Sequence, residues 1–463
     1  MNLKPIAWVL AAAFPLAAHA APDPELQALR DELQRIKADY ERRIEALERR
    51  LAEPAAVATV LPRPAPDPTA GAGHGHATGF NPETSLILQG QAKSMRDVPE
   101  RVISGYWPAG HAHEGEKRGL SIDHTELAFV ANIDPLFRGT ARFAVADGAI
   151  EVEEANFATL GLGNGLALKG GRFRSDIGYL NVQHPHAWDF ADAPLMHRAL
   201  FGAEGYRHDG LQLKWLAPTE LFLQFGAEIG RGDGFPGTDR NGSGAGAGAV
   251  FAKLGGDVGT AHSWQGGLSY LATRAADRVA HVEDTDPAGP NEVEGRFSGR
   301  SRAWIADFVW KWAPDGSDRH FKLQTEYFRR SEDGRLDCAS DVASSPCVGG
   351  LALGDTQSRQ SGGYVQGVWQ FMPRWRTGLR YDWLSPGTRH FDAATVFGAL
   401  DAGSHLFSAY RPKRSSLMLD WSPSEFSRLR LQFARDTAMA GITDNQVTLQ
   451  YIMSLGAHGA HKF

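Results

Sequence analysis

Cysteine is almost absent from this chain of 463 residues, which has only Cys338 and Cys347. Two cysteines can form one disulfide at most, so the fold cannot depend on a framework of cross-links. Both lie in one loop-like stretch, LDCASDVASSPCVGG. In an exported chain, a nearby pair is most simply a disulfide that closes a loop. We therefore predict a Cys338–Cys347 disulfide with no redox or metal-binding role.

Long apolar runs and an excess of charge of one sign are also missing. No run of about 18 apolar residues follows the first twenty residues, so no transmembrane helix is expected. The 48 lysines and arginines nearly balance the 54 aspartates and glutamates, which gives a net charge of −6. A nucleic-acid-binding protein would need a concentrated basic face. We therefore expect no nucleic-acid partner.

Residues 1–20, MNLKPIAWVLAAAFPLAAHA, have the pattern of a secretory signal peptide. Lys4 precedes an apolar run, and Ala18-His19-Ala20 is a small-residue cleavage site. A membrane anchor is the weaker alternative, because the apolar run is short and ends at this site. The chain is therefore predicted to be exported.

Residues 21–52 show helical periodicity, and residues 53–83 do not. In the first segment, apolar residues recur at intervals of three and four: Leu26, Leu29, Leu33, Ile36, Tyr40, Ile44, Leu47 and Leu51. The spacing predicts a short coiled coil and favours an oligomer, although a single solvated helix remains an alternative. The second segment is rich in proline, alanine and glycine, which is typical of a linker.

Residues 84–463 have no helical periodicity, and short segments of alternating apolar and polar residues replace it. Sixteen such segments are predicted as strands: 85–95, 119–133, 139–147, 150–160, 166–175, 209–217, 220–230, 247–257, 262–273, 302–313, 320–331, 361–371, 374–385, 413–422, 427–437 and 444–455. Tight turns alternate with longer polar loops, which are expected at 96–117, 176–208, 231–246, 274–300, 332–360 and 386–412. This layout predicts an all-β fold, a transmembrane antiparallel β-barrel of about 16 strands.

The stretch RWRTGLRYDWLS (374–385) shows the alternation clearly. One parity carries Trp375, Leu379, Tyr381 and Trp383, and the other carries three arginines and an aspartate. Alternate residues of a strand point to opposite faces, so one face would meet lipid and the other the water-filled interior. Segments 150–160 and 166–175 do not keep one clean parity, and either a β-bulge or a different strand register would explain each.

Charged residues of both signs lie on the parity predicted to face the lumen. The pore-lining candidates are Arg376, Arg380, Asp382, Arg428, Arg430, Lys322, Glu326, Asp307, Lys311 and Lys214. A ring of one sign selects an ion, whereas a mixed lining gives weak preference. Each arginine has two open roles: selecting ions, or pairing with an acid across the wall. The 176–208 loop, rich in aromatic and charged residues, is expected to fold into the lumen and narrow it.

Six stretches of the predicted barrel carry a resemblance to a known family. They are FNPETSLILQG (80–90), DGAIEVEEANFAT (147–159), GRFRSDIGYLN (171–181), HAWDFADAPL (186–195), WRTGLRYDWL (375–384) and SPSEFSRLRLQFARD (422–436). Together with the signal peptide, coiled coil and linker, they resemble the phosphate-selective porin family, the porin O and P group, and its relatives. The resemblance implies a sixteen-strand barrel whose selectivity comes from basic residues lining the lumen. Some relatives are labelled zinc-regulated or TonB-dependent receptors, but the roughly 60 residues before the first strand are too few for a TonB-receptor plug.

Histidine pairs in the loops are the candidate metal ligands. His111 and His113 lie in the first long loop, and His184 and His186 lie in the 176–208 loop. Imidazole and nearby carboxylates suit zinc or copper, but each pair supplies at most two good ligands. The pairs could also be ordinary polar loop residues. We hypothesise weak divalent-metal binding and no other cofactor.

These patterns together predict a passive outer-membrane porin for small hydrophilic solutes or ions. It would lie in the outer membrane of a Gram-negative bacterium as a homotrimer, with its N-terminal segment in the periplasm. Two alternatives remain: a metal-linked receptor that uses the histidine-rich loops, and a structural barrel whose coiled coil faces the cell wall. No nucleophile–base–acid spacing predicts an enzyme.

Overall fold

The structure is a computed structural model that describes residues 82–98, 101–107, 117–122, 124–146, 149–203, 205–284, 291–339, 347, 349–391 and 407–456. All of them belong to the compact unit Thr78–Phe463. The predicted signal peptide, coiled coil and linker lie outside the described residues and stay predictions. Within the described part, no helix is long and apolar enough to cross a membrane.

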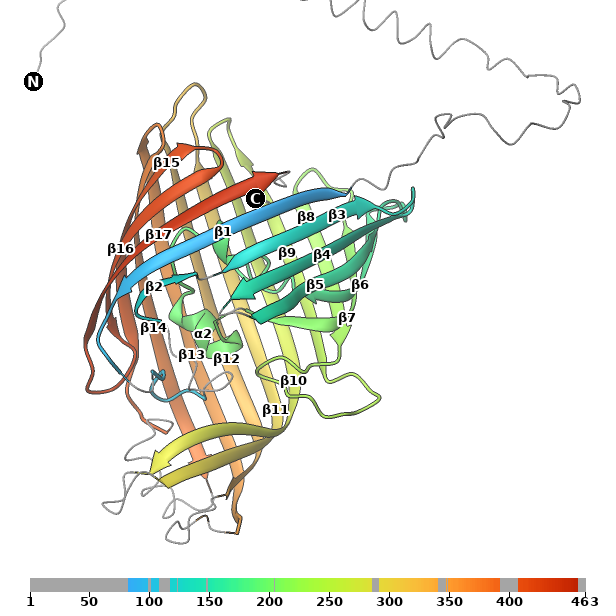
Figure 1. Cartoon of the computed structure of the whole chain (residues 1–463). Coiled ribbons are helices and arrows are strands. Elements are labelled where there is room, and N and C mark those ends of the chain that lie inside the picture. The colour runs from blue at the N-terminus through green and yellow to red at the C-terminus, as the bar shows by residue number, and fades with distance from the viewer. Residues whose placement is uncertain are drawn as a thin grey trace, which may run out of the picture. The chain divides into compact units, whose positions relative to one another are not determined.

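The described residues form one antiparallel sheet that closes on itself (Figure 1). Its first strands are β1 (Glu83–Ser94), β2 (Gly119–Ile122), β3 (Thr125–Asn132), β4 (Phe137–Ala146), β5 (Ala149–Thr159), β6 (Leu166–Arg174), β7 (Arg207–Leu216), β8 (Phe222–Gly230) and β9 (Ala247–Val258). The others are β10 (His262–Asp284), β11 (Asn291–Trp312), β12 (His320–Ala339), β13 (Leu351–Met372), β14 (Trp375–Phe391), β15 (Lys413–Ser424), β16 (Ser427–Thr437) and β17 (Asp444–Gly456).

Apart from β2 and β3, which do not pair with each other, each strand pairs with its neighbours in the sequence, and the last strand pairs with the first. The β1–β17 register runs from Ser85–Gly456 to Ser94–Val447. Strands β2 and β3 both pair with β1, at Gly90–Lys93 and Glu83–Ile87, so they are two parts of one broken strand. The prediction of a closed antiparallel barrel with sixteen strand positions is therefore confirmed.

The two faces of the strands differ as the alternation predicts. On β14, Leu379 is 66% exposed on the outer face, whereas Arg380 and Asp382 are buried on the inner face. Strand β15 alternates in the same way, with Leu417 exposed and Met418 buried. In water such an apolar outer surface would be costly, whereas in lipid it is the expected surface of a spanning barrel.

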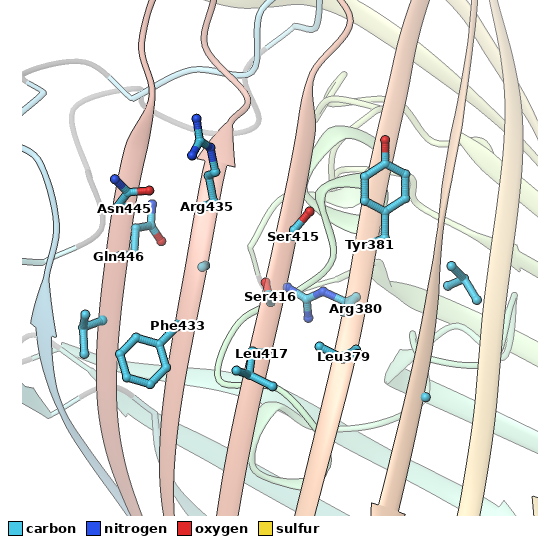
Figure 2. Close-up of a pocket in the computed structure, with 14 residues that line it drawn as sticks. Leu379, Arg380, Tyr381, Ser415, Ser416, Leu417, Phe433, Arg435, Asn445 and Gln446 are labelled. Atoms are coloured by element: carbon cyan, nitrogen blue, oxygen red, sulfur yellow. The ribbon is translucent and has the colours of Figure 1, made fainter.

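A groove of about 720 Å³ on the barrel wall shows the apolar surface in detail (Figure 2). Leu379, Leu417 and Phe433 from three neighbouring strands line it, and they lie side by side because the strands are in register. One row further along, the outward residues include Arg435 and Asn445, which are paired across β16 and β17. The outer face therefore changes from apolar to polar between one row of outward residues and the next.

Several segments predicted as long loops are strands instead. Strands β10 and β11 continue to Asp284 and Asn291, and β12 and β13 continue through most of 332–360. The predicted loops 274–300 and 332–360 are therefore largely wrong. The physical reason is a separate apolar cluster, which gives these polar hairpins a core of their own: Trp107, Ala275, Ala280, Phe297, Leu336, Cys338 and Cys347. Cys338 and Cys347 form a disulfide in this cluster, with Cα atoms 5.5 Å apart.

A β-bulge lies in β5, where the sequence pattern loses its parity. Arg142 of β4 pairs with Glu154, but the next residue, Phe143, pairs with Val152. Glu153 is therefore the extra residue, and Glu153 and Glu154 both face the interior, where both contact His184. The second irregular segment, β6, pairs continuously with β7 from Leu166 to Arg174, so no bulge explains it.

We expect a charge on the outer face to destabilise the barrel in lipid. Leu449 lies outward in the middle of β17 and is 45% exposed. Leu449→Arg should reduce the free energy of unfolding by about 2–4 kcal/mol in a bilayer, because the guanidinium group would enter hydrocarbon. Reversible urea unfolding in phospholipid vesicles measures this. The matched control is Asn445→Arg, on the same strand and face but in the polar row, and an equal loss in both variants would contradict a lipid-facing belt.

Candidate functional site: the interior of the barrel

The loop between β6 and β7 fills part of the barrel interior. It carries a 3-10 turn, η1 (Pro185–Ala187), and a short helix, α2 (Leu195–Phe201), which contacts β13 and β14 (Figure 1). Its backbone is bound by inward side chains of distant strands. Ser269 of β10 accepts a hydrogen bond from Gly178 N, and Asp382 of β14 accepts one from Leu195 N. The structure thus places this loop inside the lumen, as the sequence predicted.

An apolar core anchors the helix of this loop. The side chains of α2 pack against inward apolar residues of several strands, and the core includes Ile177, Leu195, Met196, Leu200, Phe201, Tyr206, Phe251, Ile305, Phe328, Tyr364 and Leu384. The sequence placed Ile305 on the inward parity of its strand, where it interrupts a polar pattern. The interior is therefore part apolar core and not uniformly a water-filled channel.

Ion pairs join the loop to the wall formed by β14, β15 and β16. Arg380 binds Asp192 of the loop at 2.7 Å, and Arg414 binds the other oxygen of Asp192 at 2.8 Å. Arg376 bridges Asp189 of the loop and an acid of β15. Arg380 also donates to Asp382 on its own strand at 3.0 Å. These arginines are therefore occupied by acids, which favours the pairing role over ion selection.

The other predicted pore-lining residues also face inward, and most of them contact the same loop. Lys214 binds Asp176 at 2.8 Å, Lys322 binds Asp189, and Arg428 donates to the carbonyl oxygen of Trp188. Glu326 accepts hydrogen bonds from Tyr179 N and from His197. Arg430 donates both to Asp420 and to Trp188 O. The predicted lining is thus largely the surface on which the loop rests.

The last two predicted lining residues are Asp307 and Lys311. Both lie on the inward parity of β11. Asp307 is 6% exposed, and neither of its oxygens accepts a hydrogen bond from the described residues. Its side chain faces Gly267 of β10, where a Cβ atom would lie 2.3 Å from Asp307 Oδ2. A side chain at 267 would therefore displace this carboxylate from its present position.

The loop carboxylates are stabilised in their charged form. Burial raises the pKa of Asp192, but Arg414 and Arg380 outweigh it and hold that pKa well below its usual range. Burial likewise raises the pKa of Asp189, and Lys322 and Arg376 more than compensate. A carboxyl group whose pKa is lowered by folding stabilises the folded state at every pH above its ordinary pKa. This stabilisation is lost only as the pH falls through the lowered pKa.

Of the predicted metal ligands, the structure places His184 and His186 and brings them together. Their rings stack with centroids 5.8 Å apart, and His184 contacts three glutamates of the wall. Burial and Arg174 lower the pKa of His184, but hydrogen bonds to these glutamates outweigh both and raise it to about 10. His111 and His113 lie outside the described residues, so their role as ligands stays a prediction.

Sequence reasoning missed three groups that the structure places at these contacts. Arg414 lies on the inward parity of its segment, so the alternation could have identified it. Glu153 could not be placed, because the bulge hides its parity. His124 is a single histidine at the break between β2 and β3, and only the fold brings it near Glu153.

One relative shows which family this chain belongs to. It is an uncharacterised protein of Aquifex aeolicus (strain VF5), 33% identical over 412 residues, which are 83% of this chain and 80% of the relative. The chain belongs to the same family as this protein. No protein-family model matches the chain. The resemblance of this family member to phosphate-selective porins therefore stays a prediction.

Solved structures give only weak matches to this member of the family. A loop-deletion mutant of OmpT, an outer membrane protein of Vibrio cholerae, has a TM-score of 0.49 and 10% identity, with coverage of 81% and 99% of the two chains. The outer membrane channel DcaP of Acinetobacter baumannii has a TM-score of 0.48 and 14% identity, with coverage of 83% and 100%. An anion-selective porin from Comamonas acidovorans has 0.45 and 9%, with coverage of 81% and 99%. These values are too low to carry an argument about function.

We expect Asp192→Asn to loosen the loop. The amide would leave Arg380 and Arg414 buried beside a neutral partner, and breaking a buried ion pair costs about 3–5 kcal/mol. The loop should then be cleaved by an added protease much faster than in the wild type, as measured by the appearance of fragments cut near 176–206. Asp315→Asn, in the exposed turn between β11 and β12, is the matched control. Equal cleavage rates in all three proteins would contradict the anchoring role.

The same ion pairs predict how the loop responds to acid. Because the pKa values of Asp189 and Asp192 are lowered, their contribution is complete at neutral pH and weakens only below about pH 4. Protease resistance of the loop should therefore be constant from pH 7 to pH 5. A protease active over this range provides the measurement, and a loss of resistance already near pH 6 would contradict the assignment.

Proposed function

We propose that this protein is a passive channel of the outer membrane of a Gram-negative bacterium. The observation that supports it is a closed barrel with an apolar outer face and a charged interior that one folded-in loop narrows. The predicted signal peptide supports export. A barrel of sixteen strand positions is wide enough to enclose water beside such a loop. Small hydrophilic solutes and inorganic ions are the substrates that fit this interior.

The charge arrangement supports weak selectivity. Arg376, Arg380 and Arg430 are paired with acids, so these three do not form a free ring of positive charge at a constriction. Phosphate selectivity, which the porin resemblance implies, would need such a ring. We therefore propose passive diffusion of small hydrophilic solutes without strong preference for the anion or the cation.

The two alternative functions differ from this proposal in what they predict. A metal-linked receptor would bind divalent metal without conducting ions. A structural barrel would neither bind metal nor conduct ions, and its coiled coil would carry its function.

Assembly as a homotrimer stays a prediction that follows from the coiled coil, and sedimentation of the full chain in detergent measures it.

Planar-bilayer recording tests the proposed channel. The wild-type protein should give stable conductance steps with a reversal potential near zero in a salt gradient. A variant in which residues 182–203 are replaced by a short glycine-serine linker should conduct at least about twofold more, because the narrowest cross-section widens. The control is a linker of the same composition in the β11–β12 turn. If the folded wild type and the folded loop variant both insert into the bilayer and neither conducts ions, the proposal is overturned.

A further inference from the structure

Four buried side chains converge at the inner wall beside the lumen loop. His124 precedes β3, Glu126 lies in β3, Glu153 is the bulge residue of β5, and His184 belongs to the loop. All four residues are buried, and one ligand atom from each lies within 4.8 Å of the others. They come from three separate parts of the chain, so only the folded barrel assembles them.

Three distances in this cluster are close to those between ligands of a tetrahedral metal ion. His184 Nδ1 lies 3.0 Å from Glu126 Oε2 and 3.2 Å from Glu153 Oε2, and His124 Nε2 lies 3.3 Å from Glu153 Oε2. Ligand atoms bound to zinc at about 2.0 Å in a tetrahedron lie about 3.3 Å from one another. The remaining pairs of ligand atoms lie within 4.8 Å of one another, so a single ion can contact all four once these side chains draw closer together.

Glu126 and Glu153 each have one carboxylate oxygen bound by an arginine and the other directed toward the centre of the cluster. Glu126 Oε1 is bound by Arg142, and Glu153 Oε1 is bound by Arg174 at 2.8 Å. Their Oε2 atoms face the two histidines. Glu126 is fully buried, yet its Oε2 accepts no hydrogen bond of good geometry, and His124 Nε2 makes none either. Buried polar atoms without such a bond are rare in folded proteins, and a bound cation would satisfy both.

The second nitrogen of His184 is held as in known metal sites. Its Nε2 hydrogen-bonds Glu154 Oε1 at 2.8 Å, while Nδ1 points toward Glu126 and Glu153. A histidine that ligates a metal commonly donates its other N–H to a carboxylate, which fixes the ring and increases the basicity of the ligating nitrogen. The bulge makes this possible, because it turns both Glu153 and Glu154 to the same face.

We propose that the barrel wall binds one divalent transition-metal ion, such as Zn²⁺, through four side chains: His124, Glu126, Glu153 and His184. Two imidazoles and two carboxylates suit zinc and its neighbours, whereas calcium and magnesium prefer oxygen ligands alone. The ion would tie the lumen loop to β3 and β5. This inference goes beyond the proposed channel and does not depend on conduction.

A second proton on His184 is the alternative to a metal ion at this site. The same glutamates stabilise a second proton on His184, and the imidazolium would then supply the positive charge that the ion otherwise supplies. The two states differ in a measurable way, because only the metal site needs His124 as a ligand and binds the ion with a stoichiometry of one.

Metal titration of the full chain in detergent tests the proposal. After treatment with a chelator, Zn²⁺ should bind with a stoichiometry of one by calorimetry, and Co²⁺ should give the strong visible absorption of a tetrahedral site. His124→Ala and Glu153→Gln should each weaken binding by more than about 100-fold, whereas Glu154→Gln should weaken it by about 10- to 100-fold. The Co²⁺ spectrum of the wild type tests the site even if a variant does not fold.

A second variant controls for the histidine pairs outside the described residues. It replaces His74, His76, His111, His113, His458 and His461 with alanine, and it should keep the single site and its Co²⁺ spectrum. Loss of binding in this variant, or binding that His124→Ala leaves unchanged, would overturn the proposal. Absence of stoichiometric Zn²⁺ binding by the wild type would overturn it as well, and would leave the proposed channel untouched.

Discussion

The hydrogen bonds between β1 and β17 remove the last free edge of the sheet. From Ser85–Gly456 to Ser94–Val447, the strand next to the linker and the last described strand pair in full register. Without this seam, a sheet with an apolar outer face would expose unpaired amides to lipid, where each costs several kcal/mol. Closure also creates an enclosed interior. Every inward side chain and the lumen loop depend on this enclosure for their neighbours.

Charge matching determines what this interior can contain. Arg380, Arg414 and Asp192 place two guanidinium groups around one carboxylate, and the wall supplies further acids beside them. A buried charge is tolerated when it is paired, so the loop can enter the barrel only because it brings its own acids. The apolar residues of α2 add a second attachment that needs no charge. The loop is therefore held by two independent kinds of contact.

The sequence predicted regular features well and irregular ones poorly. Alternation located all sixteen strand positions and the inward parity of residues such as Arg376 and Glu326, because a strand has a fixed period of two. It did not reveal that β10 to β13 extend beyond the predicted strands, since their added residues are mostly polar. The few apolar ones, such as Phe297 and Leu336, form a core only with one another and with distant Trp107. Nor could it join His124 to His184, because contacts between distant segments leave no mark in a single sequence.

The bulge at Glu153 has a consequence for how this strand can vary. An inserted or deleted residue normally reverses the parity of every residue that follows it within a strand. In β5 the bulge absorbs the extra residue, Glu153, so the residues before and after it keep the facing that their pairing with β4 requires. Deleting Glu153 would therefore give a regular ladder without turning any other residue of the strand to the opposite face, because Val152 and Glu154 already pair with consecutive residues of β4. The strand would lose only the carboxylate that binds Arg174 and contacts His184, so β5 contains a residue that the interior needs and the sheet does not.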